Sequence, residues 1–186
     1  VTLKTPAGGI VVIGSHTKKT TMQMEELKKL KDILFIEMNS DLVLQEGGLE
    51  GEVERILSLS GNAIRNGQTV AIYTRRQLLT VENDTKDAAL VRSVKISDAV
   101  QSLVGRLEVT PGFVVAKGGI TSSDVGTKAL QVKRATVLGQ IRPGIPVWQT
   151  GEESRFPGTP YIIFPGNVGE VETLREAVEI LMGQTI

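Results

Sequence analysis

The sequence has no cysteine, a single histidine, few aromatic residues and no excess of charge of either sign. Its 186 residues contain 21 Lys and Arg against 21 Asp and Glu. Without cysteine there are no disulfides, thiolate metal sites or cysteine nucleophiles, and His16 alone leaves little for a zinc site. Balanced charge removes the broad attraction behind non-specific binding to nucleic acids or anionic membranes. We therefore expect neither nucleic acid nor membrane among the partners.

Long apolar runs are also missing, and no segment approaches the roughly 18–20 residues needed to span a bilayer. The absence of cysteine suits a reducing cytosol, so we expect a cytoplasmic protein. No repeat, low-complexity tract or linker divides residues 1–186, which have the length of one domain. The chain begins at Val1 instead of methionine, which suggests a piece of a longer protein.

What the sequence does contain is an alternation of short apolar runs with amphipathic segments. The short, β-branched runs are typical of buried strands, and the 3.6-residue periodicity between them indicates helices. This pattern predicts an α/β fold, a three-layer sandwich with a mostly parallel or mixed central sheet. We expect strands at 9–13, 33–36, 69–73, 113–116, 136–138, 146–148 and 161–164. We expect helices ending near 31, 65, 107, 130 and 182, of which the third begins at 91.

Hydroxyl side chains mark the expected helix starts. The candidates to cap the first helix are Thr17, Thr20 and Thr21, and Gln23 follows Thr20 at the spacing of a capping box. Ser122 or Ser123 is expected to cap a helix that runs to about residue 130.

Three loops between an expected strand and an expected helix are rich in glycine and hydroxyl groups. In open α/β sheets, ligands bind beyond the carboxyl ends of the strands, where helix N-termini offer free backbone N–H groups. Glycines permit tight turns and close approach of a ligand to the backbone, so these loops are candidates for binding an anion. We expect the three to converge on one cleft: residues 14–17, 117–124 and 164–169.

Other side chains near these loops have both a functional and a plain structural interpretation. Lys117 is a candidate for a phosphate-directed charge, as is Arg155 if its loop folds over the cleft. Asp124 either holds magnesium, acts as a base, or only complements a helix dipole. His16 is a base, a nucleotide contact or a solvated side chain, and Trp148 is core or pocket wall. Neither a Rossmann fingerprint nor a Walker-A motif is present.

Four sequence motifs, taken in their order along the chain, resemble those of one family. They are Val-Ala-Lys-Gly-Gly-Ile-Thr-Ser-Ser-Asp at 115–124, Val-Leu-Gly-Gln-Ile-Arg-Pro-Gly-Ile-Pro-Val-Trp at 137–148, Glu-Ser-Arg-Phe-Pro-Gly at 153–158 and Phe-Pro-Gly-Asn-Val-Gly at 164–169. Together with Val-Ile-Gly-Ser-His at 12–16, they resemble the C-terminal nucleotide-binding domain of the four-carbon acid sugar kinases. The resemblance covers essentially the whole chain.

This resemblance implies ATP-dependent phosphorylation of the terminal hydroxyl of a four-carbon sugar acid, such as threonate, erythronate or a 3-oxo-tetronate. Magnesium is expected with the ATP, although no metal ligand and no catalytic residue can be named from the sequence. The ATP-binding positions of the family correspond here to Ser15, Gly118, Gly119, Ile120, Thr121 and Gly166.

The resemblance also implies that residues 1–186 are the C-terminal half of a two-domain kinase, with the N-terminal sugar-acid-binding domain absent. The expected partners are therefore ATP, the sugar acid and that missing domain, and pairing as a homodimer is left open. Two alternatives differ in class: a nucleotide-binding module that catalyses nothing alone, and a regulatory or assembly module that binds no nucleotide.

Overall fold

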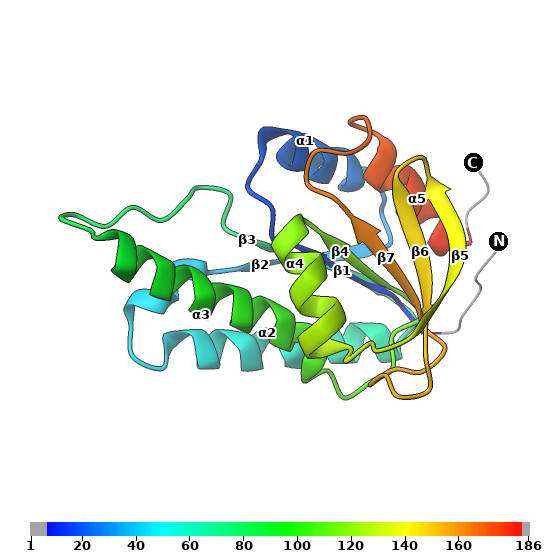
Figure 1. Cartoon of the computed structure of the whole chain (residues 1–186), viewed down its shortest axis with the longest axis horizontal. Helices are drawn as coiled ribbons and strands as arrows, with labels where there is room; N and C mark the ends of the chain where they lie inside the picture. Colours follow the sequence, from blue (N-terminus) through cyan, green and yellow to red (C-terminus); the bar gives the residue numbers. More distant parts are fainter. Residues whose placement is uncertain (1–6, 184–186) are drawn as a thin grey trace.

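The computed structural model describes residues 7–183 as one seven-stranded sheet between two layers of helices (Figure 1). The strands lie in the order β2-β3-β1-β4-β7-β6-β5. They are β1 (Ile10–Ile13), β2 (Ile33–Met38), β3 (Thr69–Thr74), β4 (Val114–Lys117), β5 (Ala135–Arg142), β6 (Ile145–Thr150) and β7 (Pro160–Phe164). The helices are α1 (Lys18–Leu27), η1 (Ser40–Leu44), α2 (Gly48–Arg65), α3 (Lys86–Gly105), α4 (Gly119–Asp124), η2 (Val125–Ala129) and α5 (Thr173–Leu181).

The sheet is mixed, as the sequence predicts. The five strands β2, β3, β1, β4 and β7 run parallel, whereas β6 is antiparallel to β7 and β5 is antiparallel to β6. Every residue of β1 and β4 is buried, because helices cover both faces of the parallel part. The three-layer α/β architecture is confirmed.

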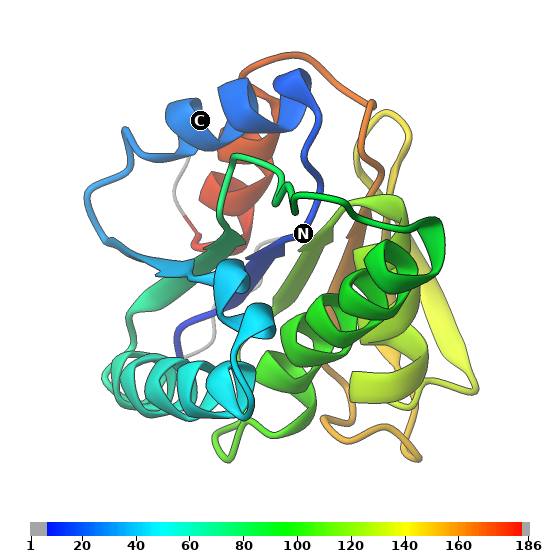
Figure 2. The same cartoon turned by 90° about the vertical axis from the view of Figure 1, so that its left-hand side faces the viewer.

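Alternate residues of each strand supply two separate cores. Ile10 and Val12 of β1 pack toward α2, α3 and η2, whereas Val11 and Ile13 pack toward α1 and α5. The two-residue period of a strand produces this division. Figure 2 shows the result, with α1 and α5 above the sheet and α2 and α3 below it. Between residues 7 and 183, no helix combines the length and the apolar character needed to cross a membrane.

The first helix is capped by Thr17, whose hydroxyl accepts a hydrogen bond from the N–H of Thr20. The capping box between Thr20 and Gln23 is not formed. Gln23 is buried, and its amide nitrogen donates to the carbonyls of Val168 and Glu170, at 3.2 and 2.8 Å. Gln23 therefore ties α1 to the segment that precedes α5, a contact that local spacing cannot reveal.

The prediction that Ser122 or Ser123 caps a helix was wrong. The helix begins at Gly119, three residues before Ser122, and Gly118 occupies the capping position without a side-chain hydrogen bond. The Ser122 hydroxyl instead donates to the carbonyl of Gly119. After Asp124 the chain continues directly into the π-helical turns of η2.

Two elements extend the farthest beyond their predicted ranges. Helix α3 begins at Lys86, five residues before the predicted 91, and Thr85 caps it. Its first turns project past the sheet with Leu90, Val91 and Val94 exposed (Figure 1), so they have no buried stripe for periodicity to detect. Strand β5 extends in both directions from the predicted 136–138 because its pairing with β6, and not burial, defines it.

Candidate functional site

The carboxyl ends of β1, β4 and β7 form a point where the chain leaves the sheet in opposite directions. From β1 and β7 the chain proceeds to α1 and α5 on one face, and from β4 it proceeds to α4 on the other (Figure 1). Such switch points are where open α/β sheets bind ligands. The three glycine-containing loops follow these three neighbouring strands.

Hydrogen bonds show that the loops lie against one another. The N–H of Gly14 donates to the carbonyl of Lys117 at 3.1 Å, and the N–H of Gly118 donates to the carbonyl of Phe164 at 2.9 Å. A Cβ placed on Gly118 would lie 3.2 Å from the backbone nitrogen of Ser15. The structure thus brings together residues 14–17, 117–121 and 164–167, which we call the cradle.

Ser15 lies at the centre of the cradle. Its hydroxyl accepts a hydrogen bond from Thr20 at 2.9 Å, and its Oγ would be 3.4 Å from a Cβ on Gly166. The guanidinium of Arg76 donates to the Ser15 carbonyl at 2.7 Å and also to the hydroxyl of Thr21. Sequence reasoning missed Arg76, although its position just after β3 is the available signal.

Lys117 lies beneath the cradle and not in its opening. Its side chain is fully buried, and Nζ donates to the carbonyls of Pro165 and Gly166 at 2.7 and 3.0 Å. Nζ also lies 4.3 Å from the centre of the Phe164 ring. Burial, with a smaller contribution from the charge of Lys19, lowers the pKa of Lys117 to about 8. Lys117 therefore holds the third loop from within.

The contacts of Lys117 determine how the peptide groups of the third loop, residues 164–167, are oriented. The hydroxyl oxygens of Thr17 and Thr20 also lie 3.4 and 3.3 Å from the Gly166 carbonyl oxygen. In a trans peptide the carbonyl and the N–H point in opposite directions. Since the carbonyls of Pro165 and Gly166 point inward, the N–H groups of Gly166 and Asn167 point away from Lys117. Successive amides arranged in this way are suited to an anion.

Helix α4 contributes a second set of amides. The first intrahelical bond runs from the N–H of Ser122 to the carbonyl of Gly118, so the N–H groups of Gly119, Ile120 and Thr121 precede the hydrogen-bonded turns. Tyr161 of β7 fixes the helix, because its buried hydroxyl donates to the carbonyl of Ser122. Burial raises the pKa of Tyr161, which keeps this donor protonated.

Close packing between β1 and α4 requires glycine at position 14. A Cβ on Gly14 would lie 2.0 Å from Oγ1 of Thr121. We expect Gly14→Ala to lower the free energy of unfolding by about 1–3 kcal/mol, because the helix or the threonine must shift. Thr121→Ala removes the clashing oxygen, so in the double variant most of the loss should be recovered. Urea unfolding of the four proteins tests this, and purely additive losses would contradict it.

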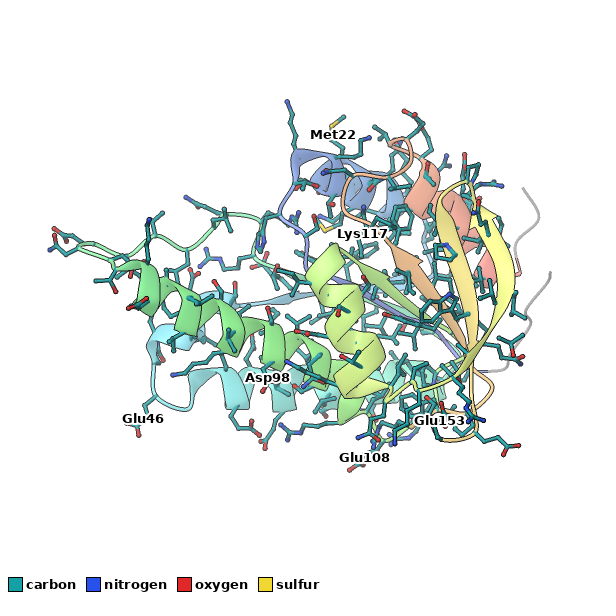
Figure 3. All side chains as sticks on the ribbon, in the orientation of Figure 1. Met22, Glu46, Asp98, Glu108, Lys117 and Glu153 are labelled. Carbon is teal, nitrogen blue, oxygen red and sulfur yellow. The ribbon has the colours of Figure 1, made fainter. Side chains whose placement is uncertain are left out.

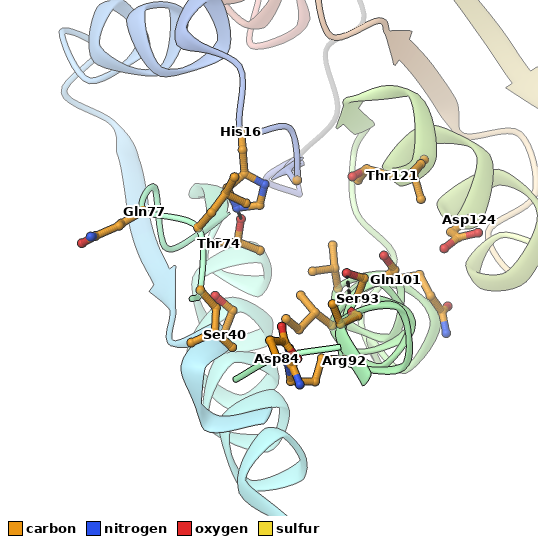
Figure 4. A pocket seen from close by; sticks show the side chains of 18 residues that line it. His16, Ser40, Thr74, Gln77, Asp84, Arg92, Ser93, Gln101, Thr121 and Asp124 are labelled. Carbon is orange, nitrogen blue, oxygen red and sulfur yellow. Dashed lines mark hydrogen bonds and ion pairs between the residues drawn. The ribbon is translucent and has the colours of Figure 1, made fainter. Parts of the chain in front are cut away.

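A cavity of about 270 Å³ opens beside the cradle (Figure 4). Four residues belong to both: Gly14, His16, Ile120 and Thr121. The cavity is not lined by Ser15, Gly118, Gly119 or Gly166. Figure 4 shows His16 and Thr74 on one side of the cavity and Thr121 and Asp124 on the other. Helix α3 forms the floor between them.

His16 is neutral in this setting. Partial burial lowers its pKa, and the nearby Arg76 charge lowers it further. Its Nε2 lies 3.2 Å from the Arg75 carbonyl and 3.2 Å from the Thr74 hydroxyl. Because a carbonyl can only accept, Nε2 carries the proton. His16 therefore braces the end of β3 and offers no positive charge to an anion.

The remaining candidates separate into different parts of the fold. Arg155 lies away from the cradle, because its guanidinium donates to the carbonyl of Leu107 at the amino end of β4. Figure 3 shows nearby Glu153 at the opposite end of the sheet from Lys117. Arg155 was a candidate only if its loop folded over the cleft, and the structure does not meet this condition. Trp148 packs edge-to-face on Tyr161, with ring centres 6.4 Å apart, and is part of the core.

Asp124 lies three residues after the cradle segment that ends at residue 121, and its partner is Lys128 at 3.7 Å. Within residues 7–183, no three His, Cys, Asp or Glu side chains gather as a metal site would require. The opening of the cradle is thus formed by backbone amides and hydroxyl groups, which suits an anion.

The family comparison agrees with this chemistry. The sequence model of the family described as the nucleotide-binding C-terminal domain matches residues 10–174. The chain belongs to this family. No curated protein sequence matches this nucleotide-binding domain significantly.

Solved structures share the fold of this nucleotide-binding domain at low identity. A Bordetella bronchiseptica protein of the DUF1537 family, a domain-swapped dimer with bound citrate, has 17% identity and a TM-score of 0.75, with 97% of this chain and 42% of that chain covered. A Salmonella typhimurium LT2 protein, provisionally assigned as a tRNA synthase, has 17% identity and a TM-score of 0.71, with 92% and 40% covered. A Haemophilus influenzae DUF1537 protein has 18% identity and a TM-score of 0.62, with 98% and 42% covered. The domain thus spans about two fifths of the length of these chains.

Proposed function

We propose that this chain is the ATP-binding domain of a kinase that phosphorylates the terminal hydroxyl of a four-carbon sugar acid of the threonate, erythronate or 3-oxo-tetronate type. The observation that carries the proposal is the cradle itself, in which two loops present backbone amides and the first loop presents the Ser15 hydroxyl at neighbouring strand ends. Membership of the nucleotide-binding family supports a nucleotide as the ligand. The four motifs shared with the sugar-acid kinases support the acceptor class.

In this proposal the phosphates of ATP lie on the cradle. The amides that open α4 and those of the third loop donate to phosphate oxygens, and the Ser15 hydroxyl adds one donor. Magnesium would accompany the nucleotide, coordinated chiefly by phosphate oxygens and water, and would neutralise charge during transfer. The proposed ATP contacts are Ser15, Gly118, Gly119, Ile120, Thr121 and Gly166.

The chemistry proposed is in-line transfer of the γ-phosphoryl group to the acceptor hydroxyl. Such transfer depends on positioning and charge stabilisation more than on covalent catalysis. A rigid cradle supplies both, because its amides are already fixed by Lys117, Thr17 and Tyr161 before a ligand arrives. The group that removes the hydroxyl proton belongs, in this proposal, to the sugar-acid-binding domain.

The proposal also includes that second domain, a cytoplasmic location and the pairing of two copies. The solved relatives are more than twice as long as this chain, which leaves room for an acceptor-binding domain. The domain-swapped dimer of the Bordetella relative supports pairing. Sedimentation of the chain at several concentrations would distinguish a dimer from a monomer.

Calorimetry with Mg-ATP, followed by an ADP-release assay with a panel of four-carbon sugar acids, tests the function. We expect the 186-residue chain to bind ATP without turnover, and the longer protein that contains it to release ADP with at least one acid. A chain that does not bind ATP would contradict the proposal and favour a regulatory module. Turnover by the chain alone would refute the claim that a separate domain binds the acceptor. If the longer protein were inactive with every acid, the chain would be a non-catalytic module.

A further inference from the structure

The cavity beside the cradle differs from the cradle in charge. Arg92 reaches it but forms an ion pair with Asp84, and Asp124 on the opposite wall faces Lys128. His16 is neutral for the reasons given above. Among the residues that line the cavity, all within 7–183, no cation is left without an anionic partner. A sugar acid or a phosphate would therefore gain little by entering it.

The walls of the cavity are instead suited to a flat, partly apolar ring. Ile120 is 72% exposed and Leu78 is 64% exposed, although both are large hydrophobic side chains at the edge of this hollow. Hydroxyl and amide groups from α3 and α4 alternate with the apolar walls. Sites for small organic ligands combine apolar walls with a few polar groups in this way. The apolar walls are formed by Leu78, Leu79, Ala89, Ile96, Val100 and Ile120.

The cavity and the cradle lie one after the other along the carboxyl ends of the strands. The cavity lies over the ends of β3 and β1, where Thr74 and Gly14 line it. The cradle continues from there over β4 and β7, in the order of the strands. At its far end, Nζ of Lys19 donates to the carbonyl of Asn167 at 3.3 Å, so positive charge lies at the end remote from the cavity.

We propose that the cavity holds the base and ribose of the nucleotide, while its phosphates extend across the cradle toward Gly166 and Lys19. The inference rests on the proposed function and adds which part of the nucleotide each region binds. Ile120 is then shared between the two regions, its amide directed to phosphate and its side chain to the base. The neutral cavity excludes the phosphates, so the nucleotide binds in one direction only.

The test compares ATP with inorganic tripolyphosphate, both with magnesium, by calorimetry on the whole chain. Ser97→Trp places an indole in the cavity from α3, and Ser58→Trp on the exposed face of α2 is the matched control. Ile120→Ser trims an exposed side chain and so keeps the test valid if the tryptophan variant folds poorly. We expect Ser97→Trp to weaken ATP roughly tenfold or more and Ile120→Ser roughly threefold, with tripolyphosphate changed less than about twofold.

Three other outcomes would overturn the inference, and they differ from one another. If Ser97→Trp and Ile120→Ser leave ATP affinity unchanged while the wild type binds both ligands, the base lies elsewhere and the proposed function stands. If the two variants weaken ATP and tripolyphosphate equally, the cavity holds phosphate. If the wild type binds neither ligand, the proposed function fails together with the inference.

Discussion

Replacing Gly119 with aspartate is expected to abolish ATP binding without weakening the fold. A Cβ on Gly119 would meet nothing within 4 Å, and its backbone has no left-handed conformation that demands glycine. The position opens α4, where an acidic side chain complements the helix dipole and stabilises by up to about 1 kcal/mol. The same carboxylate would face the phosphates, and we expect ATP affinity to fall roughly a hundredfold or more.

Thermal unfolding with and without Mg-ATP measures both effects at once, since a ligand that binds only the folded state raises its stability. Gly51→Asp is the matched control, because Gly51 lies in α2, also with open space around it, and far from the cradle. The control should keep the full ATP-induced stabilisation. If Gly119→Asp also kept it, phosphate would not lie at the start of α4.

Replacing Lys117 with methionine is expected to weaken ATP binding through the third loop. Methionine has a similar length but donates no hydrogen bond, so the carbonyls of Pro165 and Gly166 lose the donor that turns them inward. We expect a loss of about 1–3 kcal/mol in ATP binding, or roughly 5- to 150-fold. Removal of a buried charge offsets the lost hydrogen bonds, so the free energy of unfolding at pH 7 should change by less than about 1 kcal/mol.

Lys19→Met is the control for Lys117→Met, because it also removes a positive charge from this end of the cradle. In that loop Lys19 donates to the Asn167 carbonyl, whereas the Gly166 carbonyl is held by Lys117. We expect its loss to weaken ATP roughly threefold or less. Equal losses in the two variants would mean that Lys117 acts by charge alone, and a large loss of stability with unchanged affinity would mean that it only supports the fold.

The pH dependence of stability provides an independent check on Lys117. Burial lowers its pKa from 10.5 to about 8 in the folded chain, so between these values the unfolded chain binds more protons. The penalty for burying the charge is therefore complete below pH 8 and is relieved as the pH rises toward 10.5. Relative to Lys117→Met, the wild type should gain stability over this interval in urea unfolding. A bound polyphosphate favours the charged amine, so ATP binding above pH 8 should take up a proton.

The fold was largely predictable from sequence because its strands are short, buried on both faces and separated by helices with apolar stripes. Periodicity fails where burial does not define an element. The exposed start of α3 has no such stripe, and β5 is defined by its pairing with β6. The start of α4 was misplaced because Gly118 begins the helix without a capping side chain. Its φ of 120° and the hydrogen bond from its N–H to the carbonyl of Phe164 fix the turn.

The loops that form the candidate site were predictable from the sequence, but the side chains that support those loops were not. Glycines and hydroxyls after strands indicate amides available to an anion, and the parallel strand order then brings those loops together. The roles of Lys117, Gln23 and Arg76 depend on contacts across 48, 145 and 61 residues of sequence. No local pattern contains such a contact, so the sequence left Lys117 as a candidate for either a phosphate-directed charge or a structural role. In the structure its side chain lies beneath the loop that we propose binds phosphate.

A crystal structure of the chain with magnesium and a non-hydrolysable ATP analogue tests the central claim most directly. The account predicts phosphate oxygens within hydrogen-bond distance of the amides of Gly119, Ile120 and Gly166, with the base in the cavity beside Ile120. A nucleotide bound on another face of the sheet, or phosphates in the cavity with the base on the cradle, would contradict it.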